Sequence, residues 1–240
     1  MLNAMSAPLH PLQASRQGQR VIVVGAGEQG ELAYEYLTHD SPHEVVGFAV
    51  EAEFLTADHL CGLPIVALAE IAEQFPPAEY RTLVAVSSNQ LNRVRSRLYA
   101  HVKSLGYDCI SFVSSRAFVW HNVQIGENTF VFECNVLQHR VRIGDNVILW
   151  SGNHVGHQTV IEADCFVASH AVISGFCEIG RSSYLGVNCC LANNLIVAED
   201  CVIGAGAVVV KPTEAGQVYV GNPARPTGRS SLATFGVPGR

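Results

Sequence analysis

Aliphatic residues recur at every sixth position from residue 113 to residue 209, and this period dominates the second half of the chain. A sustained hexapeptide period is typical of a parallel β-helix. Three hexapeptides make one triangular coil of eighteen residues, so residues eighteen apart are expected to stack about 4.8 Å apart. The aliphatic first positions are Val113, Val119, Ile125, Val131, Leu137, Ile143, Leu149, Val155, Ile161, Val167, Ile173, Ile179, Leu185, Leu191, Val197, Ile203 and Val209.

The fifth position of the hexapeptide is usually small, which fits a position that turns into the narrow interior of the prism. Four of the eight cysteines, Cys165, Cys177, Cys189 and Cys201, occupy it. Cys165 and Cys201 share a column but lie two coils apart, about 10 Å by the strand spacing, which is too far for a disulfide. We therefore predict that these cysteines pack as small hydrophobic side chains.

The first half of the chain alternates between strand and helix patterns. The apolar runs "RVIVV", "EVVGFAV", "LPIV", "RTLVAV" and "DCISFV" predict strands, with helices between several of them. One predicted helix carries its apolar residues at 3-4-4-3 spacing, which is the period of a helix face. Strands that alternate with helices predict a parallel sheet with helices on both faces. The apolar residues of that helix are Leu91, Val94, Leu98, Val102 and Leu105.

A glycine-rich loop joins the first strand to the first helix. Gly25, Gly27 and Gly30 match the G-x-G-x-x-G spacing, which brings a backbone and a helix N-terminus close to the phosphates of a nucleotide. Glu51 lies 21 residues after Gly30, near the position where an acidic residue binds a ribose. A tight turn without a ligand is the alternative explanation for the glycines.

These patterns divide the chain into four predicted segments. Residues 1–19 form a flexible N-terminal extension, residues 20–112 a Rossmann-like α/β domain, residues 113–212 a β-helix of about five to six coils, and residues 213–240 a C-terminal cap and tail. The fold class is therefore α/β followed by β.

The composition of the chain limits the binding partners and the cellular compartment that are expected for it. The chain is 48% hydrophobic and 15% charged, with a net charge of −6 and no long Lys/Arg run, which excludes a disordered chain and argues against nucleic acid as a partner. The sequence has no run of about 18 apolar residues, so no membrane span is predicted. The first twenty residues lack the apolar core of a secretory signal. A cytoplasmic protein with free thiols is the resulting expectation.

Three histidines fall in one column of the predicted β-helix. His121, His139 and His157 are all third positions of their hexapeptides, on the outside near a corner, and Gly175 is the next member of that column. They are surface or subunit-packing residues, ligands of a zinc ion between chains as in the β-helical carbonic anhydrases, or catalysts. Parallel imidazoles in one column converge poorly on a tetrahedral metal. A neutral imidazole suits proton abstraction, so we predict that His157 is a general base.

Several stretches together resemble the bacterial sugar acyltransferases of the sialic acid O-acetyltransferase and bacillosamine N-acetyltransferase type, which include the GDP-perosamine N-acetyltransferases. These stretches, from about Arg20 to Pro226, are "GAGEQGELAYEYL", "VAVSSNQLNRVR", "SGNHVGHQTVI", "SGFCEIGRSSYLGVN", "CVIGAGAVVVK" and "VYVGNPARP". The resemblance implies a left-handed β-helix, a homotrimer, acetyl-CoA bound between two β-helices, and a nucleotide-linked sugar on the N-terminal domain. It also implies a role in surface-polysaccharide or lipopolysaccharide biosynthesis.

The resemblance also assigns residues. The family's catalytic histidine falls on His157, and the residues that could support it are Gln158, His154, Asn153 and His139. The thioester and pantetheine positions fall on Gly175, Val187 and Ala205. The nucleotide contacts fall on Gly25, Gly27, Glu28, Gly30, Glu51 and Asn89. No metal is implied.

The chain departs from the family at two places. Gln158 follows the histidine where the family often has an acidic residue, and Val50 and Glu51 stand where the second strand usually ends in an Asp pair. A cluster of bulky aromatic residues is predicted either to shape a sugar pocket or to pack between subunits; it comprises Phe130, Phe132 and Trp150.

The function expected from these features is acetyl transfer from acetyl-CoA to the amine of a GDP-, UDP- or dTDP-linked amino sugar. His157 removes the proton while the amine attacks the thioester directly. Sugar O-acetylation and a non-catalytic β-helix that binds a nucleotide sugar are the alternatives.

Overall fold

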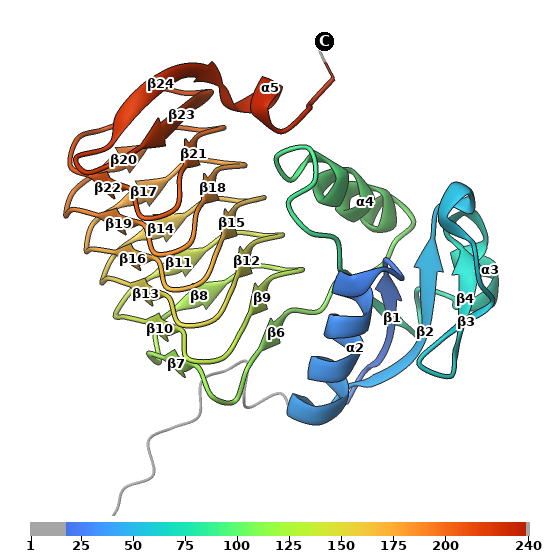
Figure 1. The fold of residues 1–240 in the computed structure, drawn as a ribbon. Helices are drawn as coiled ribbons and strands as arrows, with labels where there is room; N and C mark the ends of the chain where they lie inside the picture. The colour runs from blue at the N-terminus through green and yellow to red at the C-terminus, as the bar shows by residue number, and fades with distance from the viewer. Residues whose placement is uncertain (1–17, 239–240) are drawn as a thin grey trace, which may run out of the picture.

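The computed structural model describes residues 18–238, and the chain forms an α/β sheet domain beside a β-helix (Figure 1). The predicted N-terminal extension lies outside the described residues as far as residue 17, and so do residues 239–240 of the predicted tail. In the described part, no helix combines the length and the hydropathy that a membrane span requires.

The N-terminal domain is built on a five-stranded sheet in the order β3-β4-β2-β1-β5. All neighbours pair in parallel except β3, which runs antiparallel to β4 at the edge. The predicted Rossmann-like parallel sheet is therefore confirmed, with one antiparallel edge strand added. The strands are β1 (Arg20–Val24), β2 (Glu44–Val50), β3 (His59–Leu60), β4 (Leu63–Ala67) and β5 (Arg81–Val84).

Helices cover both faces of this sheet, as the alternating pattern predicts. On one face, α2 buries Ala33 and Leu37 against β1 and β2. On the other face, Ile71 of α3 and Leu98 and Val102 of α4 pack against the opposite side of β1. The helices are α2 (Glu28–Asp40), α3 (Ile71–Gln74) and α4 (Arg93–Ser104), with short 3-10 helices η1 (Ala52–Phe54) and η2 (Leu68–Glu70).

The start of α4 differs from the prediction. Leu91 was expected on the apolar face of this helix, but the helix begins at Arg93. Gln90, Leu91 and Asn92 instead form a turn with φ of 50°, 48° and 66°. This left-handed turn carries Leu91 away from the helix face and into a separate cluster with Val202 and Val218 of the β-helix region. Packing across the two domains thus overrides the local helix period.

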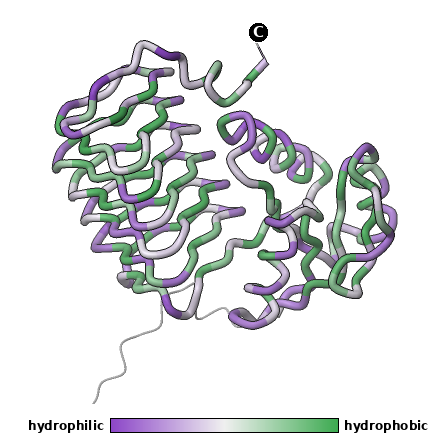
Figure 2. The backbone as a smooth tube through the Cα atoms, in the orientation of Figure 1, coloured by the Kyte–Doolittle hydropathy of each residue, from purple (hydrophilic) through white to green (hydrophobic). Residues whose placement is uncertain are grey.

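The β-helix has the eighteen-residue register that the hexapeptide period predicts. His154 pairs with Val136 on one side and with Val172 on the other, and the strands from β6 to β22 pair at this same offset of eighteen residues. The aliphatic first positions point inward, and residues such as Leu137, Leu149 and Val155 are fully buried. Hydrophobic and hydrophilic positions alternate along the coils in Figure 2.

The three sheets of the prism differ in what lies against them. The domain face packs on the N-terminal domain; its strands are β6 (Phe112–Val113), β9 (Phe130–Val131), β12 (Ile148–Leu149), β15 (Phe166–Val167), β18 (Tyr184–Leu185), β21 (Val202–Ile203), β23 (Gln217–Val220) and β24 (Arg225–Ser230). The apolar face consists of β7 (Phe118–Val119), β10 (Val136–Leu137), β13 (His154–Val155), β16 (Val172–Ile173), β19 (Cys190–Leu191) and β22 (Val208–Val209). The polar face consists of β8 (Gln124–Ile125), β11 (Arg142–Ile143), β14 (Val160–Ile161), β17 (Glu178–Ile179) and β20 (Ile196–Val197).

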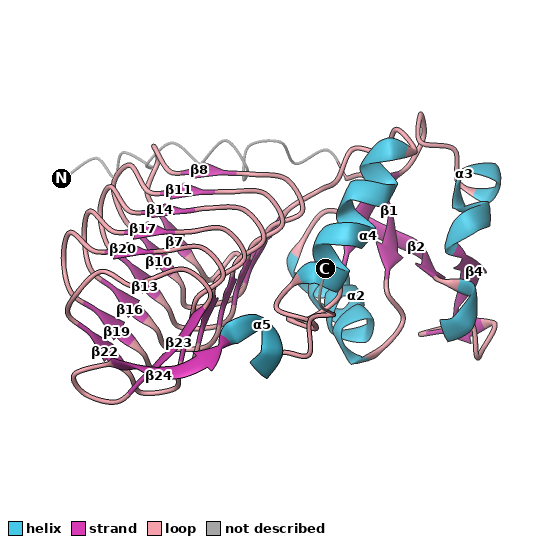
Figure 3. Cartoon of the chain, turned by 90° about the horizontal axis from the view of Figure 1, so that it is seen from above, coloured by secondary structure: helices cyan, strands magenta, loops and turns pink. Residues whose placement is uncertain are grey.

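The C-terminal segment covers one end of the prism. β23 continues the domain face in parallel with β21, and β24 returns antiparallel to it. The short helix α5 (Ser231–Thr234) follows, and Figure 3 shows it between the β-helix and the α/β domain.

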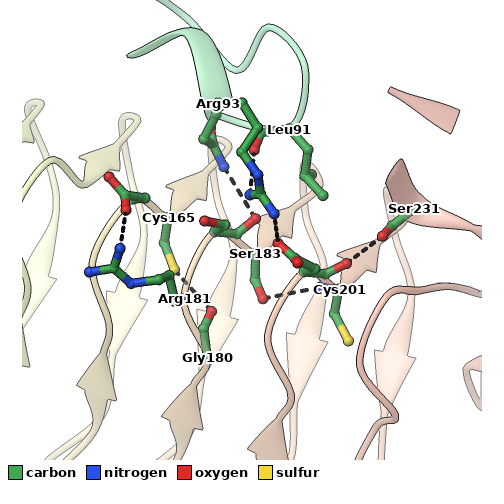
Figure 4. A network of polar contacts seen from close by, with 12 residues as sticks. Leu91, Arg93, Cys165, Gly180, Arg181, Ser183, Cys201 and Ser231 are labelled. Carbon is green, nitrogen blue, oxygen red and sulfur yellow. Dashed lines mark hydrogen bonds and ion pairs between the residues drawn. The ribbon is translucent and has the colours of Figure 1, made fainter. Parts of the chain in front are cut away.

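The cysteines at fifth positions are free and buried, which confirms their predicted packing role. Burial raises the pKa of the Cys165 and Cys189 thiols to about 12, so both stay protonated and unreactive at neutral pH. The Cys165 thiol donates to the carbonyl of Gly180 on the next coil, a contact visible in Figure 4. These thiols therefore act as small side chains that also satisfy backbone carbonyls.

From Asn128 to Gly206, the fourth position of each hexapeptide adopts a left-handed conformation, which turns the chain at the corners of the prism. The φ angles there lie close to 60°, a region that Asn, Asp and Gly enter at little cost and other residues enter with strain. The strained corners are occupied by Cys134, Arg140, Gln158, His170, Phe176 and Ser182.

Replacing Cys134 with Asn is expected to raise the free energy of unfolding by about 0.5 kcal/mol, because Asn relieves part of the left-handed strain. Cys134 is exposed with φ of 59°, so the change leaves the core untouched. Urea unfolding measures the effect, and Cys134→Ala is the matched control that should show no gain. Equal stability of the Asn and Ala variants would contradict this account.

Candidate functional site

A pocket of about 950 Å³ lies where the α/β domain meets the β-helix. Its walls come from the carboxyl ends of β1, β2 and β5, from the first turns of α2, and from Trp150 of the β-helix. Ligands of open parallel sheets bind at this end of the strands. The predicted nucleotide residues that line the pocket are Gly25, Gly27, Glu28, Glu51 and Asn89.

The glycine-rich loop is held by close backbone contacts. Gly25 has φ of +116°, and a Cβ there would lie 2.6 Å from the carbonyl oxygen of Ala85, the residue that follows β5. A Cβ on Gly30 would lie 2.1 Å from the carbonyl oxygen of Gly25. Gly30 is buried and does not line the pocket, so its predicted ligand contact is replaced by a packing role: it lets α2 approach the loop. Gly27 has open space around it and faces the pocket.

The polar rim of the pocket is acidic. Glu28, Glu31 and Glu35 of α2 and Glu51 at the end of β2 all line it, and no Lys or Arg does. Arg97 of α4 donates two hydrogen bonds of 2.7 and 2.8 Å to the Glu51 carboxylate and holds the pKa of that carboxyl below its usual range. The pocket therefore offers oxygen acceptors, which suit the hydroxyls of a ribose or the amine of a sugar.

A buried guanidinium joins the pocket wall to the β-helix. Arg95 of α4 is fully buried, and it donates to the carbonyls of Val86 and Ser87, which line the pocket. It also donates to Asn146 and to the carbonyl of Cys165 on the β-helix. Burial lowers its pKa to about 10, so the group remains cationic at neutral pH.

A second connection between α4 and the β-helix starts at Arg93, the first residue of this helix. Arg93 pairs with Asp200 of the β-helix, and the Ser231 hydroxyl donates to the carbonyl of Asp200. Figure 4 shows Leu91 and Arg93 reaching from the turn before α4 towards these β-helix turns, with Ser231 close by. The pocket wall formed by residues 86–92 is thus fixed at several points to the prism.

His157 occupies the corner between the apolar face and the polar face. It is exposed, as predicted, on the turn between β13 and β14. Its ring lies over Gly175 of the next coil, where an added Cβ would meet the ring at 2.6 Å. The Phe176 ring packs edge-on against it with centroids 4.9 Å apart. The absence of a side chain at Gly175 is therefore what makes room for the imidazole.

The side chain within hydrogen-bonding distance of the His157 ring is that of Gln138, not that of Gln158. Gln138 Oε1 lies 3.0 Å from the backbone nitrogen of His157 and 3.4 Å from Nδ1. Gln158 takes the left-handed corner position with φ of +58° and is exposed. The supporting residue predicted from the sequence is the next residue along the chain, whereas the residue that bonds to His157 lies nineteen positions earlier, on the preceding coil.

The other predicted supporting residues lie apart from this ring. Asn153 is buried in the opposite corner, where it donates to the carbonyl of Trp150 and accepts from the N–H of Ala171, so it is a turn residue. His154 points outward on the apolar face. His139 shares the corner column with His157, and its Nδ1 lies 3.0 Å from Asn122 Nδ2.

The residues predicted to line the thioester and pantetheine do not lie close together within a single chain. Gly175 lies beside His157, and its N–H donates to Asn193 Oδ1 at 3.0 Å. Val187 and Ala205 are exposed at the corner between the domain face and the apolar face. The whole apolar face therefore separates these two residues from His157.

Two members of the predicted aromatic cluster pack inside the chain, and the third lines the pocket. Phe130 and Phe132 are buried between α2 and the domain face, where Tyr36 packs edge-on against Phe132 with centroids 4.9 Å apart. Trp150 stacks on Phe132 at 4.7 Å and alone among the three lines the pocket. Within residues 18–238, no group of three or more His, Cys, Asp or Glu side chains is arranged to hold a metal ion.

Comparisons with known proteins agree with this architecture. The bacterial transferase hexapeptide model, which spans six repeats, matches residues 140–175. The acetyltransferase domain of PglB from Neisseria gonorrhoeae aligns with a TM-score of 0.76 at 24% identity, over 87% of this chain and 100% of that one. The chain has the fold of a hexapeptide-repeat acetyltransferase. The resemblance predicted from the sequence is confirmed at the level of the fold.

Two further solved structures share this hexapeptide-repeat fold. A perosamine N-acetyltransferase from Caulobacter crescentus, solved with CoA and GDP-perosamine, aligns with a TM-score of 0.76 at 22% identity, over 88% of this chain and 97% of that one. WeeI from Acinetobacter baumannii aligns with a TM-score of 0.73 at 24% identity, over 87% of this chain and 99% of that one. Among curated protein sequences, none matches this chain.

Proposed function

We propose that this protein transfers an acetyl group from acetyl-CoA to the amine of a nucleotide-linked amino sugar. The observation that carries the proposal is an exposed imidazole, His157, seated over the side-chain-free Gly175 at an open corner of the prism. A transferase fold supports the same conclusion, since similar proteins were solved with CoA, acetyl-CoA and GDP-perosamine. An exposed imidazole in such a corner can accept a proton from an incoming amine.

The pocket in the α/β domain is the proposed site of the nucleotide. Its loop N–H groups at the start of α2 suit a phosphate, and the Glu51 carboxylate suits ribose hydroxyls. None of these contacts recognises the base of the nucleotide. A GDP, UDP or dTDP carrier therefore satisfies them equally well. The acidic rim of α2 favours an acceptor that carries an amine over an additional anion.

A trimer is the proposed assembly, and the apolar face is the proposed contact. Its outward side chains are largely apolar and accessible: Phe118 is 52%, Trp120 43% and Val172 42% exposed. The polar face instead carries Gln124, Arg142 and Glu178 outward. Apolar surface of this extent is normally covered by a partner.

Packing through the apolar face would complete the catalytic groove. The two corners that flank this face carry the two halves of the predicted donor site, His157 with Gly175 and Val187 with Ala205. Around a threefold axis, one corner of each copy meets the other corner of the next copy. The proposed groove for the pantetheine arm therefore lies between two chains.

The proposed chemistry needs one proton acceptor and no acyl-enzyme. His157 Nε2 takes the proton as the amine nitrogen bonds to the thioester carbon, and the carbon–sulfur bond breaks to release CoA thiolate. The Gly175 N–H can stabilise the developing oxyanion only when Asn193 moves away from it.

Replacing Val172 with Glu is expected to break the assembly, because a charge in the centre of the apolar face would be buried at the contact. The same substitution at Ile196, which is 53% exposed on the polar face, is the matched control and should leave the assembly intact. Sedimentation velocity measures both. A Val172→Glu protein with unchanged mass in solution would place the contact elsewhere.

A thermal-shift panel tests the function directly. Acetyl-CoA and CoA should each raise the melting temperature, and so should one of a set of GDP-, UDP- and dTDP-linked amino sugars. Mass spectrometry of the matching pair should then show a product heavier by one acetyl group. Loss of that group in mild base would mark an ester and an O-acetyltransferase, whereas no response to CoA would favour a non-catalytic nucleotide-sugar-binding protein.

A further inference from the structure

The contact between Gln138 and His157 has a defined direction. Gln138 follows β10, one coil before His157, and is half-buried beside the apolar face. Its Oε1 lies 3.0 Å from the backbone nitrogen of His157 and 3.4 Å from the ring Nδ1. One atom thus faces two nitrogens of the same residue.

The backbone contact fixes which end of the Gln138 amide faces the ring. A backbone N–H is always a donor, so the atom that receives it must be the amide oxygen and not the NH₂ group. The same oxygen then faces Nδ1. A lone pair on Nδ1 would face a lone pair of this oxygen and be repelled, whereas an Nδ1–H can donate to it, so the neutral ring is favoured with its proton on Nδ1 and its lone pair on Nε2.

We propose that Gln138 is the positioning residue of the site, which holds His157 in the tautomer with hydrogen on Nδ1 and a free lone pair on Nε2. The proposal rests on the transferase function proposed above, and it replaces the supporting role expected of Gln158. Among the described side chains, Gln138 is the one within hydrogen-bonding distance of the ring. It sets the orientation of the base without adding a charge.

Among the described residues, this corner carries no carboxylate on the coil before His157 or on the coil after it. On the preceding coil, the same corner carries His139 and Arg140, and on the following coil it carries Gly175 and Phe176. The corner is therefore neutral or cationic. A neutral orienting group leaves the imidazolium formed during the reaction without charge stabilisation, so the proton should pass on readily.

Nitrogen-15 NMR of the histidine rings in the ligand-free protein tests the tautomer, with the His157→Asn protein used to assign the signal. At high pH the wild-type ring should be protonated at Nδ1. Gln138→Leu should shift the ring towards the tautomer with hydrogen on Nε2, whereas Gln124→Leu, the same change on the polar face, should not. A wild-type ring protonated at Nε2 overturns the proposal, whatever the enzyme's activity.

Kinetics supply the second readout. Gln138→Leu should lower kcat about tenfold with little change in the KM for acetyl-CoA. Gln138→Glu should keep the tautomer and move the acid limb of the kcat/KM profile to higher pH, because a carboxylate stabilises the protonated ring. Unchanged kcat in the Leu variant and an unmoved profile in the Glu variant would contradict a positioning role. If no donor or acceptor supports turnover, the transferase proposal fails while the NMR result still decides the tautomer.

Discussion

Replacing His157 with Asn is expected to lower kcat about a hundredfold or more while leaving the melting temperature unchanged. The side chain is exposed at a corner and belongs to no core cluster, so its removal leaves no cavity. Asn is close in shape but cannot accept a proton. Steady-state kinetics with acetyl-CoA and the matched acceptor measure the loss, and the KM values should change little.

His121→Asn is the matched control for this result. His121 stands in the same column two coils earlier and is also exposed, but no glycine opens a space beside its ring. Its replacement should change kcat by less than about twofold. Full activity in the His157→Asn protein would move the proton acceptor to another group or to a buffer molecule, because a free sugar amine already has a nucleophilic lone pair.

Replacing Arg95 with Met is expected to cost about 3 kcal/mol or more of the free energy of unfolding. The guanidinium is fully buried and donates hydrogen bonds to carbonyls of the pocket wall and of the β-helix at the same time. Met fills a similar volume but donates no hydrogen bond, so the carbonyls of Val86, Ser87 and Asn146 lose the guanidinium as their donor. Urea unfolding followed by circular dichroism measures the loss, and the binding of nucleotide sugars should weaken in parallel.

Arg97→Met provides the matched control on the same helix. Arg97 pairs with Glu51 in an exposed ion pair, and its side chain is 56% accessible. Pairs of that kind contribute about 0.2–1 kcal/mol. Similar losses of stability in the two variants would mean that the buried Arg95 contacts add nothing beyond an ordinary surface pair.

The β-helix could be predicted from the sequence almost completely, and the reason is local. Each hexapeptide places its own aliphatic residue inward, so the register needs no knowledge of distant segments, and strands such as β13 pair at the expected offset. The position of His157 at an exposed corner followed from the same period. The glycine-rich loop was also predictable, because the spacing of its glycines is a local signal and the contact of Gly30 with the Gly25 carbonyl lies within one strand–loop–helix unit.

Contacts between the two domains could not be predicted in this way. Arg95 has the sequence signature of an exposed helix residue, yet its partners lie 51 and 70 residues away on the β-helix. Leu91 fits the apolar period of α4 but is drawn into a cluster beyond it. Gln138 meets His157 nineteen residues later. In each case the deciding partner comes from another coil or another domain, and a local pattern carries no information about it.

The left-handed turn at residues 90–92 ties two remote parts of the molecule together. Its Leu91 side chain is buried against Val202 and Val218, in a cluster to which Leu232, Phe235 and Val237 also contribute. Asn89, one residue before this turn, lines the pocket. The segment from Leu232 to Val237 thus supports the turn that adjoins the pocket rim. Removal of this C-terminal segment is therefore expected to disturb the pocket rim, which is distant from it in the sequence but close to it in space.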